Sequence, residues 1–113
     1  MIVDSTVQAL GFALDGLTEQ QQVIANNIAN QDTPGFTASQ VDFQSSLQSA
    51  LNDGGNATIT TTASPTPAGP NGNNVVISDQ VSAAQQNSLQ YQAVVEALTN
   101  AFSLQKTAQD ASF

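Results

Sequence analysis

Two long stretches of this sequence, one near each end, place apolar residues alternately three and four residues apart. Sustained over several turns, this spacing predicts a helix that pairs with another helix as a coiled coil. The first helix is predicted from about Asp4, as its N-cap, to Asn30. Gln21 interrupts its row of apolar contact positions once. These positions are Val7, Leu10, Leu14, Leu17, Ile24 and Ile28.

The second stretch predicts a helix that begins after Ser78 or Asp79, both good N-caps, and ends at about Ala108. The simplest fold joins the two helices as a coiled coil within one chain, so we expect a mainly α-helical protein. A two-helix coil leaves apolar surface exposed, which favours a bundle with neighbouring subunits. The predicted contact positions of the second helix are Val81, Ala84, Ser88, Tyr91, Val95, Leu98, Phe102 and Gln105.

The segment between the two helices has a different pattern. Val41 and Phe43 alternate as in an extended segment, and Asp42 can cap a short helix that ends within residues 52–55. From Asn56 to Asn74 there is no aromatic and no charged residue, and Pro and Gly cluster between 65 and 72. This composition predicts a flexible segment, mobile in isolation or ordered only by neighbours.

These observations divide the chain into four parts. They are an N-terminal helix (1–30), a turn with a short helix (31–51), a flexible linker (52–77) and a C-terminal helix (78–113).

Charge and composition exclude several classes of function. The 113 residues include 9 Asp and Glu and 1 Lys, a net charge of −8, with no His and no Cys. One cation cannot neutralise a run of phosphates, so nucleic acids and anionic membrane surfaces are excluded as partners. Asp15 and Glu19 lie one helical turn apart without a convergent partner, which indicates a solvated face. We therefore expect neither an enzyme nor a metal or cofactor site.

The N-terminus lacks the basic region and the continuous apolar core of a cleaved signal peptide. The sequence also has no apolar run of the length that a transmembrane helix needs. We therefore expect no transmembrane segment.

The end of the first helix carries the most specific motif of the chain. Carboxamides of its asparagines can bond neighbouring carbonyls or amides on a second helix. Thr33 precedes a proline and Pro34 donates no N–H, so the helix must stop here. Gly35 can adopt the positive φ that a type II turn requires at its third residue. The motif comprises Ala25, Asn26, Asn27, Ile28, Ala29 and Asn30, followed by Thr33, Pro34, Gly35 and Phe36.

This motif resembles the N-terminal signature of the bacterial flagellar rod and hook family of axial proteins. The residues from Asn87 to Ala93, continuing through Leu104, resemble the C-terminal helix of its proximal rod subunits. In that family the two terminal helices pair as a coiled coil and subunits stack into a tube. The resemblance implies a structural subunit of the proximal rod that transmits torque and continues the export channel. It also implies that the motif residues take part in assembly.

Partners and location follow from the same resemblance. It implies self-assembly with other rod subunits in a helical rod, and contacts with the ring–rod adaptor, the membrane–supramembrane ring and the export gate. It further implies a periplasmic place in the basal body, reached through the flagellar type III apparatus without a cleaved signal peptide. The near absence of Lys and Arg departs from the family's expected charge pattern. Another short proximal rod subunit, or a secreted coiled-coil adaptor or chaperone, remains an alternative.

Overall fold

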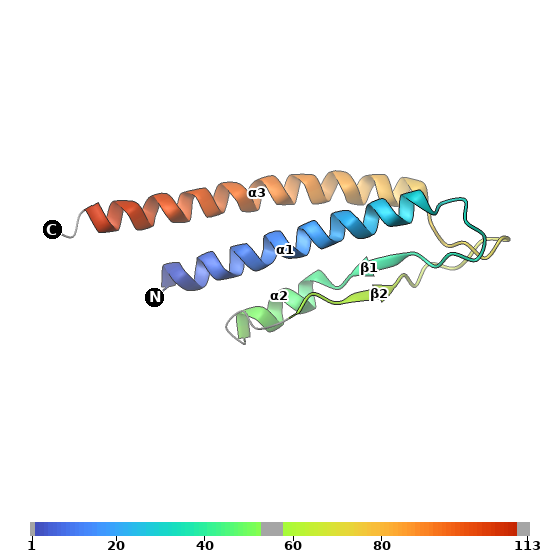
Figure 1. Cartoon of the computed structure of the whole chain (residues 1–113), viewed down its shortest axis with the longest axis horizontal. Helices are drawn as coiled ribbons and strands as arrows, with labels where there is room; N and C mark the ends of the chain where they lie inside the picture. The colour runs from blue at the N-terminus through green and yellow to red at the C-terminus, as the bar shows by residue number, and fades with distance from the viewer. Residues whose placement is uncertain (1, 53–57, 111–113) are drawn as a thin grey trace.

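The two terminal helices form and run antiparallel along the molecule (Figure 1). The computed structural model describes residues 2–52 and 58–110. It contains α1 (Ile2–Ala29), β1 (Ser39–Val41), α2 (Phe43–Asn52), β2 (Thr61–Ala63) and α3 (Ile77–Asp110). The extents of 68 × 25 × 14 Å describe an elongated body. The prediction of a mainly α-helical fold with long helices at both ends is confirmed.

Both long helices begin earlier than predicted. α1 begins at Ile2 and α3 begins at Ile77. Asp4 therefore lies within α1, and Ser78 and Asp79 lie within the first turn of α3 and not before it. Helix ends depend on weak local preferences, and such preferences leave a boundary uncertain by a residue or two.

α1 is the central element, with α3 on one side and the layer of α2, β1 and β2 on the other (Figure 1). The strands pair antiparallel, with Gln40 opposite Thr62. Next to this pairing, the Asp42 N–H donates to the Thr60 carbonyl at 2.9 Å, and the Asp42 carbonyl accepts from the Ser46 N–H at 3.2 Å. Asp42 therefore ends the strand and starts α2, at the position that the sequence predicted.

Small residues allow the elements to approach α1 closely. Its buried side chains include Ala13, Leu17 and Ile24. A Cβ placed at Gly16 would overlap the ring of Phe43, the first residue of α2. Gly16 thus lets an aromatic ring lie directly against the α1 backbone, and the ring comes from the same chain.

The described part of the middle segment, residues 58–77, contains β2, and Asn73 and Asn74 are only 7% exposed. Its mobility in the isolated chain stays a prediction. The composition argument counted the apolar area that a segment can bury, but carboxamides can order a loop by bonding its backbone groups instead. The division of the chain into four parts stays a prediction, and residues 53–57 lie outside the described part.

Candidate assembly surfaces

The chain turns sharply after α1. The Thr33 N–H donates to the Asn30 carbonyl at 3.1 Å, and the Phe36 N–H donates to the Thr33 carbonyl at 3.3 Å. Gly35 has a φ of +73°. These values agree with the turn that the sequence predicted around Pro34 and Gly35.

A second loop, residues 71–73, is hydrogen-bonded to this turn. The Asn73 side-chain Nδ2 donates to the carbonyls of Asn30 at 2.8 Å and Thr33 at 2.7 Å. The Gly35 N–H donates to the Asn71 carbonyl at 2.9 Å. Gly72 has a φ of +80°, and a Cβ there would lie 3.2 Å from the Gly35 Cα. The two loops therefore approach each other closely here, and a side chain at residue 72 would be both crowded and strained by the positive φ.

Asn74 bonds the segments that flank the two strands. Its Oδ1 accepts from the Ala38 N–H at 2.6 Å, and its Nδ2 donates to the Thr66 carbonyl at 3.0 Å. Its own N–H donates to the Phe36 carbonyl at 3.3 Å. One asparagine thus joins the segment before β1 to the segment after β2. Neither Asn73 nor Asn74 was a predicted site residue, because both stand in a stretch of linker composition.

Asn27 of the motif joins three elements. Its Nδ2 donates to the Ser39 carbonyl at 2.8 Å and to the Gln80 Oε1 at 3.1 Å, while its Oδ1 accepts from the Ser39 N–H at 3.0 Å. The side chain is 1% exposed and pairs with β1 as another strand would. The sequence anticipated carboxamide bonds to a second helix, and this residue makes one to α3.

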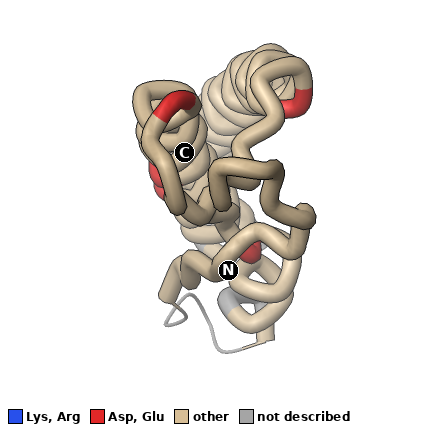
Figure 2. Tube along the Cα trace, turned by 90° about the vertical axis from the view of Figure 1, so that its right-hand side faces the viewer, with Lys and Arg blue, Asp and Glu red and all other residues tan. Residues whose placement is uncertain are grey.

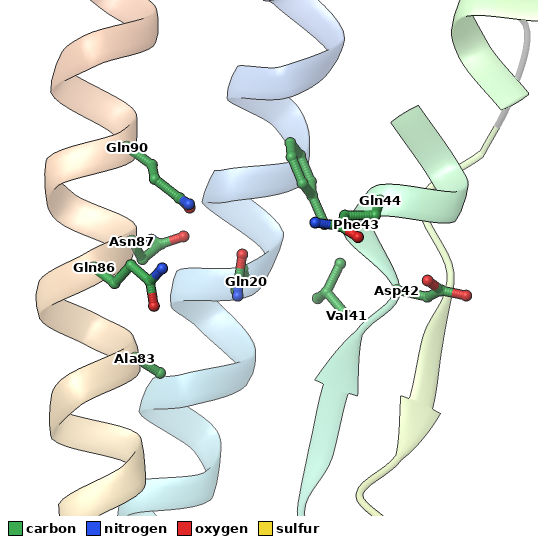
Figure 3. A pocket seen from close by; sticks show the side chains of 9 residues that line it. All are labelled: Gln20, Val41, Asp42, Phe43, Gln44, Ala83, Gln86, Asn87 and Gln90. Carbon is green, nitrogen blue, oxygen red and sulfur yellow. The ribbon is translucent and has the colours of Figure 1, made fainter. Parts of the chain in front are cut away.

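Asn87 is the buried polar contact in the middle of the α1–α3 pair. Its Nδ2 donates to the Leu17 carbonyl and to the Gln21 Oε1, both at 3.1 Å. Its buried Oδ1 accepts no hydrogen bond within the described residues. It borders a groove of about 310 Å³ whose lining is mainly polar (Figure 3). The groove lies between α1, α3 and the junction of β1 with α2, and Gln20, Gln86 and Gln90 also line it.

The row of α3 residues that faces α1 is rotated about the helix axis relative to the predicted row. Five of the eight predicted positions are exposed, among them Val81 at 45%, Val95 at 40% and Phe102 at 52%. The preceding residues Asn87, Val94 and Ala101 are buried or half-buried instead. The periodicity alone cannot choose between adjacent rows of one helix, whereas the small Ala101 and the polar Asn87 permit closer contact with α1. The inward positions are Gln80, Ala84, Asn87, Val94, Leu98, Ala101 and Gln105, with Tyr91 at the edge.

Predicted α1 positions are mostly covered. Leu17 and Ile24 are buried at 1% and 4% exposure, whereas Gln21 is exposed apart from its bond to Asn87. The remaining apolar positions of the row are half-buried, namely Val7, Leu10, Leu14 and Ile28. In the motif, Asn27 is buried and Asn30 and Phe36 are half-buried. The motif residues Ala25, Asn26, Ala29, Thr33, Pro34 and Gly35 are exposed.

Charged residues and potential metal ligands are sparse among the described residues. Seen from the end that carries the turn, several acidic positions and no basic position are visible (Figure 2). Within residues 2–52 and 58–110, no three His, Cys, Asp or Glu side chains gather as a metal site would require. The same part of the chain has no helix long and apolar enough to cross a membrane.

Comparison with known proteins is decisive for the family. Residues 11–37 match the family described as "Flagella basal body rod protein". A "Flagellar basal body rod protein FlgB" of Bacillus subtilis (strain 168) is 34% identical over 121 residues, which cover 94% of each chain. This chain belongs to the family of flagellar basal body rod proteins. Proteins of the same name from Escherichia coli (strain K12) and Borrelia hermsii are 40% and 53% identical over 60 and 50 residues.

The matches to these rod proteins differ in extent. The Escherichia coli alignment covers 50% of this chain and 44% of the relative, and the Borrelia alignment covers 44% and 37%. The Bacillus alignment spans nearly both chains, including the middle segment. These comparisons favour a FlgB-type rod protein over the adaptor or chaperone and over another short rod subunit.

Proposed function

We propose that this chain is a structural subunit of the proximal rod of the bacterial flagellum, which transmits torque and continues the export channel. The observation that carries the proposal is the 34% identity to a flagellar basal body rod protein over 94% of both chains. The elongated pair of antiparallel helices supports it, because a 68 Å body can contact several neighbours along its length.

The neighbours and the route follow from the same family. Other rod subunits, the ring–rod adaptor, the membrane–supramembrane ring and the export gate are its partners in this proposal. The chain reaches the periplasmic rod through the flagellar type III apparatus without a cleaved signal peptide. It acts by contact and not by catalysis. A sequence without His or Cys supports this part of the proposal.

Assembly surfaces in this proposal comprise the turn and the helix rows. The exposed residues Thr33 and Pro34 lie at one end of the molecule, where the hydrogen bond from Asn73 to the Thr33 carbonyl fixes the turn. A turn fixed within the chain presents the same shape to every neighbour. This reduces the conformational entropy that assembly would otherwise lose.

Deletion of the gene tests the function. We expect cells without the chain to build membrane rings but no rod, and to be non-motile, as seen by electron microscopy of isolated basal bodies. Expression of the wild-type chain from a plasmid should restore both rod and motility. Normal rods in the deletion strain would contradict the proposal.

Gly35→Val offers a sharper version of the same test. Space for a Cβ is open at Gly35, so its positive φ alone strains a β-branched residue there. We expect the variant to keep its helices, measured by circular dichroism, but to fail to restore rods. Gly35→Asn is the control at the same position, because asparagine adopts a positive φ far more readily than a β-branched residue.

A further inference from the structure

The loop of residues 71–73 contains the only Asn-Gly pair of the sequence, Asn71-Gly72. Asparagine is chemically labile, and a glycine after it lacks the Cβ that would hinder attack of the next backbone nitrogen on the carboxamide. Both residues of the pair are exposed, so water reaches them. The pair therefore has the sequence and the solvent access that spontaneous deamidation requires.

Hydrogen bonds hold both residues of the pair in the folded chain. The Gly72 N–H donates to the Gly69 carbonyl at 2.9 Å, and the Asn71 Oδ1 accepts from the Asn73 N–H at 3.1 Å. The Asn71 carbonyl accepts from the Gly35 N–H at 2.9 Å. The Gly72 nitrogen is the nucleophile of deamidation and the Asn71 carboxamide is its target. Both groups are therefore engaged in other contacts while the loop is closed.

The loop is also held against the turn after α1, at one end of the molecule (Figure 1). Asn73 is 7% exposed, and its Nδ2 donates to the carbonyls of Asn30 at 2.8 Å and Thr33 at 2.7 Å. These bonds resist the backbone movement that would bring the Gly72 nitrogen onto the Asn71 Cγ. Reaction should therefore proceed mainly during local opening of the loop.

We propose that Asn71 is a site of spontaneous deamidation, that the closed loop slows this reaction, and that the isoaspartyl product opens the loop. The Gly72 backbone nitrogen attacks the Asn71 Cγ, a C–N bond forms, and the Cγ–Nδ2 bond breaks. Ammonia leaves with the proton that the Gly72 nitrogen gives up, and a cyclic succinimide remains. Water then cleaves either of the two imide C–N bonds, which gives aspartate or isoaspartate.

Isoaspartate changes the backbone where the two loops approach each other. The main chain then runs through the Cβ and Cγ of residue 71, so it is one carbon longer before Gly72. At Gly72 even an added Cβ would lie 3.2 Å from the Gly35 Cα, which leaves little space for a longer chain. The carbonyl that accepted from the Gly35 N–H becomes a free carboxylate outside the main chain, so it no longer links the two loops. The product also adds one negative charge to a chain whose net charge is −8.

Deamidation rates of the full-length chain test the protection. The purified chain is incubated in mildly alkaline buffer with and without urea, and circular dichroism verifies the helices in the sample without urea. An endoprotease that cleaves before Asp releases residues 53–78, which Asp53 and Asp79 delimit. It cuts this peptide again at an aspartyl product but not at an isoaspartyl product, so mass spectrometry separates the two. We expect modification at residue 71 in urea, and a rate roughly tenfold or more lower in the folded chain.

Asn73→Ala tests whether the bonds to the turn provide the protection. The variant loses the bonds to the Asn30 and Thr33 carbonyls, so its rate without urea should rise severalfold. Its rate in urea should equal that of the wild type, because the reacting pair is unchanged. Asn26→Ala, at an exposed position of α1, is the matched control and should deamidate as slowly as the wild type.

The product gives a measurement that does not depend on Asn73. The isoaspartyl chain is separated from the wild type by anion exchange, and its urea unfolding midpoint should be lower. Asn71→Asp is its control, because this substitution adds the same charge without lengthening the main chain. Its midpoint should match that of the wild type.

Each part of the proposal has a contrary result. No modification at residue 71 in urea would refute the site. Equal rates with and without urea in the folded wild type, or an unchanged rate in Asn73→Ala, would refute the protection by the loop. An isoaspartyl chain that unfolds at the same midpoint as the wild type would show that the product leaves the loop closed.

Discussion

At the scale of single residues, two glycines allow close contact between segments that are far apart in sequence. Gly72 faces Gly35 across the two loops, and Gly16 faces Phe43 between α1 and α2. A methyl group would overlap the Phe43 ring at Gly16 and would be crowded by the Gly35 backbone at Gly72. Gly72 is also held at a φ of +80°, whereas Gly16 is in a regular helix.

Gly72→Ala should lower the free energy of unfolding by about 1–3 kcal/mol, because alanine in this left-handed conformation is strained and its Cβ would press on the Gly35 backbone. Thermal or urea unfolding followed by circular dichroism measures the change. Gly69→Ala is the matched control in the same loop, where the nearest atom to the new Cβ is the Asn73 carbonyl oxygen at 3.5 Å. Equal losses in both variants would show that the loop contact has no special geometry.

Gly16→Ala and Gly11→Ala should change stability in opposite directions. Both gain about 1 kcal/mol in helix propensity. At Gly16 the new methyl displaces the Phe43 ring, and we expect a net loss of about 1–2 kcal/mol in the free energy of unfolding. At Gly11 nothing lies within 4 Å, so only the gain remains. Urea unfolding of both variants decides this, and stabilisation by Gly16→Ala would mean that the ring does not pack there.

At the scale of secondary-structure elements, buried carboxamides connect α1 to its neighbours. Asn27 joins α1 to β1 and α3, and Asn87 joins α3 back to the α1 backbone. Asn87 occupies a position of α3 where a coiled coil usually places an apolar group, since it faces the α1 backbone. Polar residues at such positions fix the register and the relative orientation of helices at a cost in stability.

Asn27→Ala should lower the free energy of unfolding by about 2–4 kcal/mol, because it leaves both backbone groups of Ser39 without their partner in a part-buried place. Asn26→Ala changes the exposed neighbour of the same type and should have an effect within about 0.5 kcal/mol. The difference between the two urea midpoints is the measurement. A difference close to zero would mean that water replaces the Asn27 bonds at no cost.

At the scale of the whole molecule, the chain is extended and buries few large side chains. Its radius of gyration is 17.8 Å, against about 13 Å for a compact domain of this length. Leu17 and Ile24 are the large apolar side chains that are buried among the described residues. Much of the apolar surface of α3 would therefore be buried only in an assembly.

We predict that the isolated chain is partly unfolded, because long helices need tertiary contacts for stability. Amide hydrogen exchange should show modest protection in α1 between Ala13 and Asn27, where α2, β1 and α3 contact it, and little protection after Ala101 in α3. Assembly into rods should raise protection along both helices. Strong protection throughout α1 and α3 in a monodisperse monomer would contradict this prediction.

The sequence determined the features that depend on local chemistry. Heptad spacing specified two long helices, Asp42 marked the start of α2, and Pro34 with Gly35 placed the turn after α1. Each of these features follows from the backbone preference of a residue or from the period of a helix. None of the three requires knowledge of a distant contact. The motif around the turn also indicated the family.

Only the tertiary structure decided which row of α3 faces α1 and how the middle segment is held. Val81, Val95 and Phe102 fit the heptad period as well as Asn87, Val94 and Ala101 do, but the second row is the one that faces α1, where Asn87 bonds the Leu17 carbonyl. Asn73 and Asn74 stand in a segment of linker composition, yet each bonds a backbone group at least 36 residues away in sequence. Periodicity and composition describe one segment at a time, so they cannot reveal a bond whose two ends meet only after folding.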